Sequence, residues 1–169
     1  MFEIRQREVP ELLVVTEERT VNQAELVEWL PGAMGRVARA ADGVGGIAKT
    51  TAMPWLLRDG PGESVFIVIY EGNPNEGPVP VEVCAPIDGG RSDTGDVPSR
   101  RVPAHREAYV RLTRAQTEPA TLGSAYAEVE RWIGAQGLDV AAAPREVYYR
   151  DYFSAGPDDE VFDVAWPIR

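Results

Sequence analysis

The stretch Val81-Glu82-Val83-Cys84-Ala85-Pro86-Ile87 decides the fold, because Phe162-Asp163-Val164-Ala165-Trp166-Pro167-Ile168 repeats its pattern near the other end of the sequence. Each run alternates between the two sides of a strand and then stops at a proline, which cannot donate to a sheet ladder. Two further strand-like segments, 12–15 and 108–112, each precede a helical segment and a pair of strands. The order β-α-β-β therefore occurs twice.

This internal duplication predicts an α+β protein with antiparallel sheets, pseudo-twofold symmetry and helices flanking a central ligand cleft. Neither unit is large enough to bury both faces of its own sheet, so the two units must pack on each other. We expect a single domain over residues 1–169, with a first module near 1–88, a linker near 88–101 and a second module near 102–169. Ligand sites favour seams between modules, so the seam is the expected site.

One helix is predicted in each module. The first begins at Asn22, because Asn22 and Glu25 have the spacing of a capping box. Pro31 interrupts this helix, so we expect a kink or a restart there. The second helix covers residues 122–136, and Gly137 ends it.

Hairpins complete the two modules. Residues 64–70 and 79–85 form the first pair of strands, and residues 146–152 and 161–166 form the second. Residues 47–62 have no clear period, and we expect a short strand or a loop that covers apolar surface.

Composition excludes several functional classes. The chain of 169 residues has enough apolar side chains for a core, and its net charge is −10 with Lys49 as the only lysine. Phosphate contacts need clustered basic side chains, so we expect no direct binding to nucleic acid. Cys84 is the only cysteine, which fits a reducing cytoplasm. No secretory signal is evident, and no apolar run approaches the roughly 20 residues that span a bilayer, so no membrane partner is expected.

We also expect no cofactor and no metal. The segment 43–50 is similar to a phosphate-binding loop, but Ala48 stands where a glycine should precede the lysine. His105 is the only histidine, and with one cysteine the usual transition-metal ligands are missing. The simplest interpretation of His105 is an exposed loop residue.

Glu146 is the leading candidate for a functional residue. The period of two places Glu146 on the same face as Tyr148, with Val147 on the other face. A carboxylate beside aromatic rings is typical of sites for organic cations, because its charge and the ring quadrupoles act together. The pattern leaves open the alternative that Glu146 is a solvated residue of an edge strand. The aromatic residues that suit either such a pocket or an ordinary core include Trp29, Tyr70, Tyr109, Tyr126, Trp132 and Phe162.

The chain resembles the GyrI-like effector-binding domain family, the ligand-sensing part of multidrug-responsive and AraC-type transcription regulators, which also occurs as stand-alone proteins. The matching stretches are Phe66-Ile67-Val68-Ile69-Tyr70-Glu71-Gly72 before the first proline run, and Pro144-Arg145-Glu146-Val147-Tyr148 before the second. The resemblance spans essentially the whole chain. It implies a cleft for hydrophobic, often cationic molecules, with a glutamate at the position of Glu146 projecting into it. The segment 47–62 is longer than the family pattern.

Three functions follow from this resemblance, and we expect the first. The first is a cytoplasmic small-molecule-binding protein with Glu146 as polar anchor. The second is a hydrolase, similar to stand-alone relatives that open strained, cyclopropane-type rings of natural products, with Glu146 as general base beside a tyrosine. The third is a protein-interaction module with a vestigial cleft. We expect no helix-turn-helix segment beside the domain, and the sequence does not define an oligomeric state. The candidate ligand contacts are Glu146, Tyr148, Tyr126, Tyr70, Phe162 and Trp29.

Overall fold

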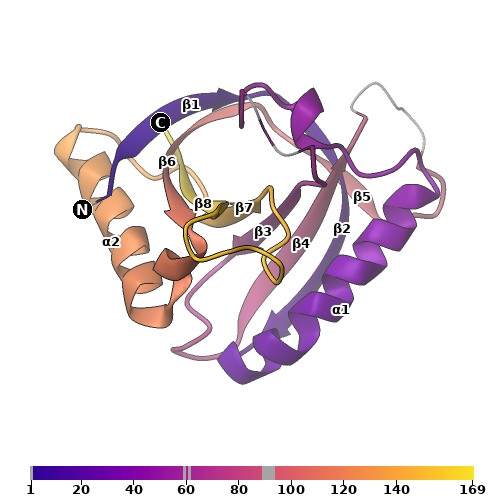
Figure 1. The fold of residues 1–169 in the computed structure, drawn as a ribbon, viewed down its shortest axis with the longest axis horizontal. Coiled ribbons are helices and arrows are strands. Elements are labelled where there is room, and N and C mark those ends of the chain that lie inside the picture. The colour runs from indigo at the N-terminus through magenta and orange to yellow at the C-terminus, as the bar shows by residue number, and fades with distance from the viewer. Residues whose placement is uncertain (1, 59, 61, 89–93) are drawn as a thin grey trace.

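A computed structural model describes residues 2–58, 60, 62–88 and 94–169. Within them, two helices flank a single eight-stranded antiparallel sheet of order β1-β6-β8-β7-β3-β4-β2-β5, which confirms the α+β class (Figure 1). Residues 89–93 of the predicted linker lie outside the described residues. The strands are β1 (Ile4–Val9), β2 (Leu12–Val21), β3 (Phe66–Tyr70), β4 (Val79–Ile87), β5 (Ser99–Val102), β6 (His105–Thr113), β7 (Arg145–Tyr148) and β8 (Glu160–Ile168). The helices are α1 (Gln23–Asp42) and α2 (Pro119–Ala135), with short 3₁₀ turns η1 (Thr50–Ala52) and η2 (Arg114–Thr117).

The strand order has the form that two β-α-β-β units would produce. Outward from the central pair β7 and β3, strands β8 and β6 follow on one side, and β4 and β2 follow on the other. The two edge strands pair across the halves of the chain: β1 pairs with β6 at one edge, and β5 pairs with β2 at the other. The predicted linker therefore ends in a strand, whose Val102 is buried opposite Leu12. The pseudo-twofold symmetry and the division into modules stay predictions.

Helix α1 begins as the capping box predicts. The Asn22 side chain accepts a hydrogen bond from the Glu25 backbone at 2.9 Å, and the Glu25 side chain accepts one from the Asn22 backbone at 3.1 Å. The helix continues across Pro31 and does not restart there. Pro31 is exposed, so water can reach the carbonyl group of Val27 that the missing N–H would have bonded.

Helix α2 begins three residues before the predicted start, with Pro119 in its first turn, where a proline costs no hydrogen bond. Gly137 follows its end with a φ of 74°, a left-handed conformation that favours glycine. Its buried face, Ala125, Val129 and Ile133, packs on β6 and β8. No helix among the described residues is long and apolar enough to cross a membrane.

Strands β4 and β8 run past the prolines at which we expected them to stop. Pro86 lies opposite Val14, and Pro167 lies opposite Glu107. The Pro86 carbonyl accepts a hydrogen bond from the Ala48 backbone at 2.7 Å, and the Pro167 carbonyl accepts one from the backbone of residue 141 at 2.8 Å. Because the nitrogen and the carbonyl of one strand residue face the same side, each proline nitrogen faces this peripheral segment. The ladder to the neighbouring strand therefore loses no donor.

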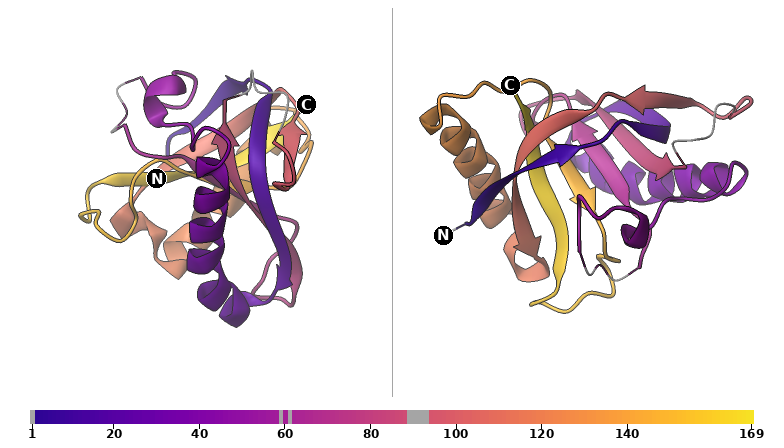
Figure 2. Two further views of the ribbon diagram at one scale, coloured as in Figure 1. Left: turned by 90° about the vertical axis from the view of Figure 1, so that its right-hand side faces the viewer. Right: turned by 90° about the horizontal axis from the view of Figure 1, so that it is seen from above.

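The sheet, which twists and curves strongly (Figure 2), is apolar on both faces. The helices cover one face. On the other, Met53 and Leu56 pack with Ile67, Ile69 and Val147. Residues 47–62, of which 59 and 61 are outside the described set, thus contribute a covering loop with the turn η1 and no strand.

The same second face carries a buried ion-pair network. Arg7 donates to Glu107 at 2.9 Å and to Asp163 at 2.7 Å, and Arg111 donates to Asp163 at 2.8 Å. The Tyr149 hydroxyl adds a bond to Asp163 at 2.9 Å. Since these residues come from β1, β6, β8 and the chain just after β7, the network ties the N-terminal strand to the second half of the sheet.

Candidate ligand-binding site

Glu146 lies in the middle of the sheet. Its strand, β7, is paired with β8 on one side and β3 on the other, and Glu146 lies between Val164 and Val68. Only 5% of the residue is exposed. The alternative of a solvated edge-strand glutamate is therefore wrong.

Three tyrosine hydroxyls donate hydrogen bonds to the Glu146 carboxylate. Tyr148 reaches Oε1 at 2.6 Å, Tyr126 reaches Oε2 at 2.7 Å, and Tyr70 reaches Oε1 at the longer distance of 3.3 Å. These donors come from β7, α2 and β3, so strand and helix residues from both halves of the chain meet at one carboxylate. A carboxylate offers about four acceptor positions, and the phenols occupy three of them.

This environment changes how the site titrates. Burial raises the pKa of Glu146, while the hydrogen bonds from the three tyrosines lower that pKa and offset part of the effect. Burial and the neighbouring carboxylate raise the pKa of Tyr70, Tyr126 and Tyr148 well above the usual tyrosine range. The phenols therefore keep their protons and act as donors. A cation placed beside Glu146 would lower its pKa.

Glu146 opens into a cavity of about 1530 Å³ between the sheet and the two helices. Small-molecule pockets commonly measure about 300–1,000 Å³, so this cavity has room for a large ligand. Two ring contacts shape its wall: Tyr148 packs against Phe162 with ring centroids 4.7 Å apart, and Tyr126 meets Trp166 edge-on at 6.4 Å. The apolar lining includes Leu26, Leu30, Met34, Phe66, Leu122, Phe162 and Trp166.

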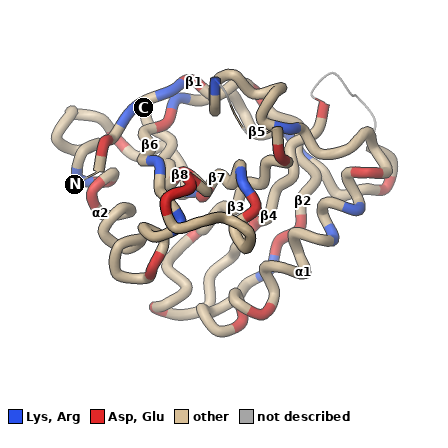
Figure 3. Tube along the Cα trace, in the orientation of Figure 1, with Lys and Arg blue, Asp and Glu red and all other residues tan. Residues whose placement is uncertain are grey.

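The charges around the cavity favour a cation. Among the described lining residues, five are acidic and two are basic. Basic positions elsewhere are spread over several elements (Figure 3). In the described part of the chain, no arginine or lysine hydrogen-bonds to Glu146, whose partners are all neutral. The acidic lining residues are Glu63, Glu71, Glu130, Glu146 and Asp151, and the basic ones are Lys49 and Arg150.

Solved structures match this arrangement of helices and strands, although no family model and no curated protein matches the sequence. The EcmrR C-terminal domain is 19% identical, with a TM-score of 0.71 over 100% of this chain and 98% of that one. A hydrolase from Listeria innocua is 11% identical, with a TM-score of 0.68 over 99% and 92%. SAV2435 bound to tetraphenylphosphonium is 13% identical, with a TM-score of 0.56 over 99% and 94%. This chain shares their fold. Identities this low carry no further conclusion.

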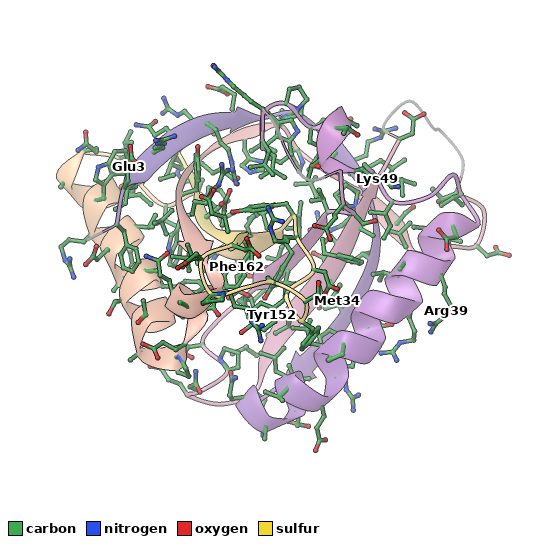
Figure 4. All side chains as sticks on the ribbon, viewed as in Figure 1. Glu3, Met34, Arg39, Lys49, Tyr152 and Phe162 are labelled. Atoms are coloured by element: carbon green, nitrogen blue, oxygen red, sulfur yellow. The ribbon has the colours of Figure 1, made fainter. Side chains whose placement is uncertain are left out.

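Four of the predicted aromatic contacts, Tyr70, Tyr126, Tyr148 and Phe162, line the cavity with Glu146 (Figure 4 labels Phe162). Trp29 does not. It lies in the core between α1 and the sheet, where its indole N–H donates to Glu17 at 2.9 Å.

Trp166 lines the cavity and was not among the predicted contacts. The period of two places Trp166 on the same face as Phe162, and this signal could have identified it.

His105 does not form an exposed loop. It begins β6, and its Nε2 lies 2.9 Å from Oε2 of the buried Glu107. Glu107 extends the ion-pair network of the second face, so His105 belongs to that network. Among the described residues, no group of three or more His, Cys, Asp or Glu side chains is placed to hold a metal ion.

Proposed function

We propose that this chain is a small-molecule-binding protein of the GyrI-like effector-binding type, that its ligands are hydrophobic organic cations, and that Glu146 is their polar anchor. One observation carries the proposal: a buried carboxylate faces a large, mainly apolar cavity and has only neutral hydrogen-bond partners among the described residues. A negative charge that no basic group neutralises attracts a cation that can enter the same space.

The tyrosines prepare the site for such a ligand. They hold the carboxylate in place and occupy most of its acceptor positions, so the ligand needs no hydrogen-bond donor of its own. Its positive charge acts on Glu146 through a medium of low polarity, where the attraction is stronger than in water. Its apolar groups pack on the rings of Tyr148, Phe162 and Trp166, whose faces also attract cations.

The comparisons support this choice of ligand. SAV2435, which shares the fold, is bound to tetraphenylphosphonium, a cation without any hydrogen-bond donor. The size of the cavity also argues against a vestigial cleft.

Titration calorimetry with tetraphenylphosphonium and its neutral counterpart triphenylphosphine oxide tests the proposal. Glu146→Gln removes the charge and keeps the shape, so it should weaken the cation by about 1–3 kcal/mol, or roughly 5–150-fold. The neutral compound should change little. The matched control is Glu28→Gln, which alters an exposed glutamate outside the lining and should leave the binding of both compounds unchanged. Equal losses for both compounds would show that Glu146 does not act through its charge.

A second candidate function is hydrolysis of a strained electrophile. It is favoured by the raised pKa of Glu146 and by the short bonds from Tyr126 and Tyr148, which place a general base beside two proton donors. A structural neighbour is a hydrolase from Listeria innocua.

Turnover of a cyclopropane-containing electrophile tests this function. A catalytic Glu146 predicts a rate that rises as the carboxylate ionises and falls by about 10²–10⁴ in Glu146→Ala. Unchanged turnover in a folded Glu146→Ala protein would exclude the role of general base.

A further inference from the structure

Two large apolar side chains stay exposed although they line the cavity. Among the described residues they are Phe153, which is 75% exposed, and Val27, which is 65% exposed, and both line the cavity. Val27 lies on α1, and Phe153 lies on the loop between β7 and β8 (residues 149–159). Exposed apolar groups on the lining of a cavity are available to contact a ligand that enters it.

Hydrogen bonds within the β7–β8 loop restrain the backbone at Phe153. Oδ1 of Asp151 accepts a hydrogen bond from the Phe153 backbone at 3.2 Å, and its Oδ2 accepts one from the Ser154 hydroxyl at 2.9 Å. The Asp151 backbone in turn donates to Glu63 at 3.3 Å. These bonds hold the backbone of Phe153 in one conformation.

The ring beside Phe153 is anchored as well. Tyr152 meets Phe153 edge-on with ring centroids 5.5 Å apart, and its hydroxyl lies 3.1 Å from that of Thr117. The Arg114 guanidinium lies 4.9 Å from the Tyr152 ring. In Figures 1 and 4 the loop, with Tyr152 labelled, projects between the two helices. The neighbouring Tyr152 ring is thus anchored, while most of the Phe153 side chain stays exposed to solvent.

The size of the cavity indicates what the exposed ring of Phe153 can contact. The cavity of about 1530 Å³ exceeds a typical pocket of about 300–1,000 Å³, so a ligand with several rings around its positive centre can extend outward from Glu146. Its outer rings would pass apolar residues such as Met34 and Leu122. They would then cover the exposed surfaces of Phe153 and Val27.

We propose that Phe153 is a specificity-determining residue, whose exposed ring packs on an aromatic group of the ligand, so that the site selects large aromatic cations over small ones. This inference rests on the proposed function, because it takes Glu146 as the anchor of the positive centre.

The experiment compares tetraphenylphosphonium with tetraethylphosphonium, which has the same charge and no rings, by titration calorimetry on the full chain. Phe153→Ala should weaken tetraphenylphosphonium by about 5–30-fold, from the lost ring contact and lost burial. Tetraethylphosphonium should change by less than about twofold, since its charge alone holds it. Phe153→Leu should fall between wild type and Phe153→Ala. Asp158→Ala, on the same loop but outside the lining, should match wild type.

The outcomes separate the two proposals. If Glu146→Gln weakens both cations while Phe153→Ala leaves tetraphenylphosphonium unchanged, the specificity role is overturned and the proposed function stands. If Phe153→Ala weakens both cations equally, the residue supports the loop and does not select ligands, which also overturns the inference. If neither cation binds wild type, or Glu146→Gln changes nothing, the proposed function fails and the inference falls with it.

Discussion

Replacing Glu146 by glutamine should stabilise the ligand-free protein at neutral and alkaline pH, because burial of this carboxylate destabilises the folded state. Burying an ionised carboxylate costs several kcal/mol. Hydrogen bonds to a charged group return about 1.5–3 kcal/mol each, and the bond from Tyr70, at 3.3 Å, belongs at the weak end. The pKa of Glu146 is raised despite these bonds, so the free-energy cost of burying the charge is larger than the stabilisation from the hydrogen bonds. We expect Glu146→Gln to gain about 1–2 kcal/mol at pH 8.

The sign of the pH dependence follows from the raised pKa. A carboxyl whose pKa is higher in the folded than in the unfolded state binds its proton more tightly when folded. The protonated Glu146 carboxyl contributes its full stabilisation below the pKa that it has in the unfolded chain. This stabilisation is lost as the pH rises through the higher pKa that Glu146 has in the folded protein. The stability advantage of the glutamine variant should therefore grow from about pH 5 to about pH 8.

Urea unfolding followed by circular dichroism measures this difference. Wild type and Glu146→Gln are compared at both pH values, with Glu130→Gln as the control for an exposed glutamate. Parallel stability curves for wild type and the glutamine variant, or a variant less stable than wild type at pH 8, would refute the reasoning that burial outweighs the tyrosine bonds.

Three further substitutions probe the remainder of the molecule by urea unfolding. Asp163→Asn removes the charge that Arg7 and Arg111 share, and it should cost about 3–5 kcal/mol; a loss below 1 kcal/mol would show that the network is not important for folding. Arg145→Met replaces a buried guanidinium whose Nε has no hydrogen-bond partner among the described residues and whose pKa burial lowers, so stability should stay within about 1 kcal/mol of wild type or increase, and a large loss would contradict this. Asn22→Ala removes the capping box and should cost about 1 kcal/mol, whereas an unchanged midpoint would mean that helix α1 does not need its cap.

Local signals in the sequence predicted much of the fold. The capping box at Asn22 and the glycine at position 137 act within one helical turn, so the start of α1 and the end of α2 followed from neighbouring residues. The alternation in β7 likewise placed Glu146 and Tyr148 on one face.

Two errors are local, since α2 begins three residues before the predicted start and α1 continues across Pro31. Other errors concern contacts between distant segments. No local pattern shows that residues 99–102 pair with β2, or that the nitrogen of Pro86 faces a peripheral segment. The position of Trp29 also depends on tertiary structure, because helical period cannot distinguish a residue that packs on the sheet from one that faces the cavity. The hydrogen bond from the Trp29 indole to Glu17 on β2 shows that Trp29 packs on the sheet.

The pairing of β1 with β6 also determines when folding can finish. Arg7 contacts Glu107, 100 residues later in the chain, and Asp163, 156 residues later. During synthesis from the N-terminus, β1 has no partner strand until most of the protein has left the ribosome, and the Arg7 guanidinium has no carboxylate from β8 until the last strand emerges. Contacts of such long separation slow folding, since a long loop must close before they form. Strand β1 is therefore among the last segments to reach its native place.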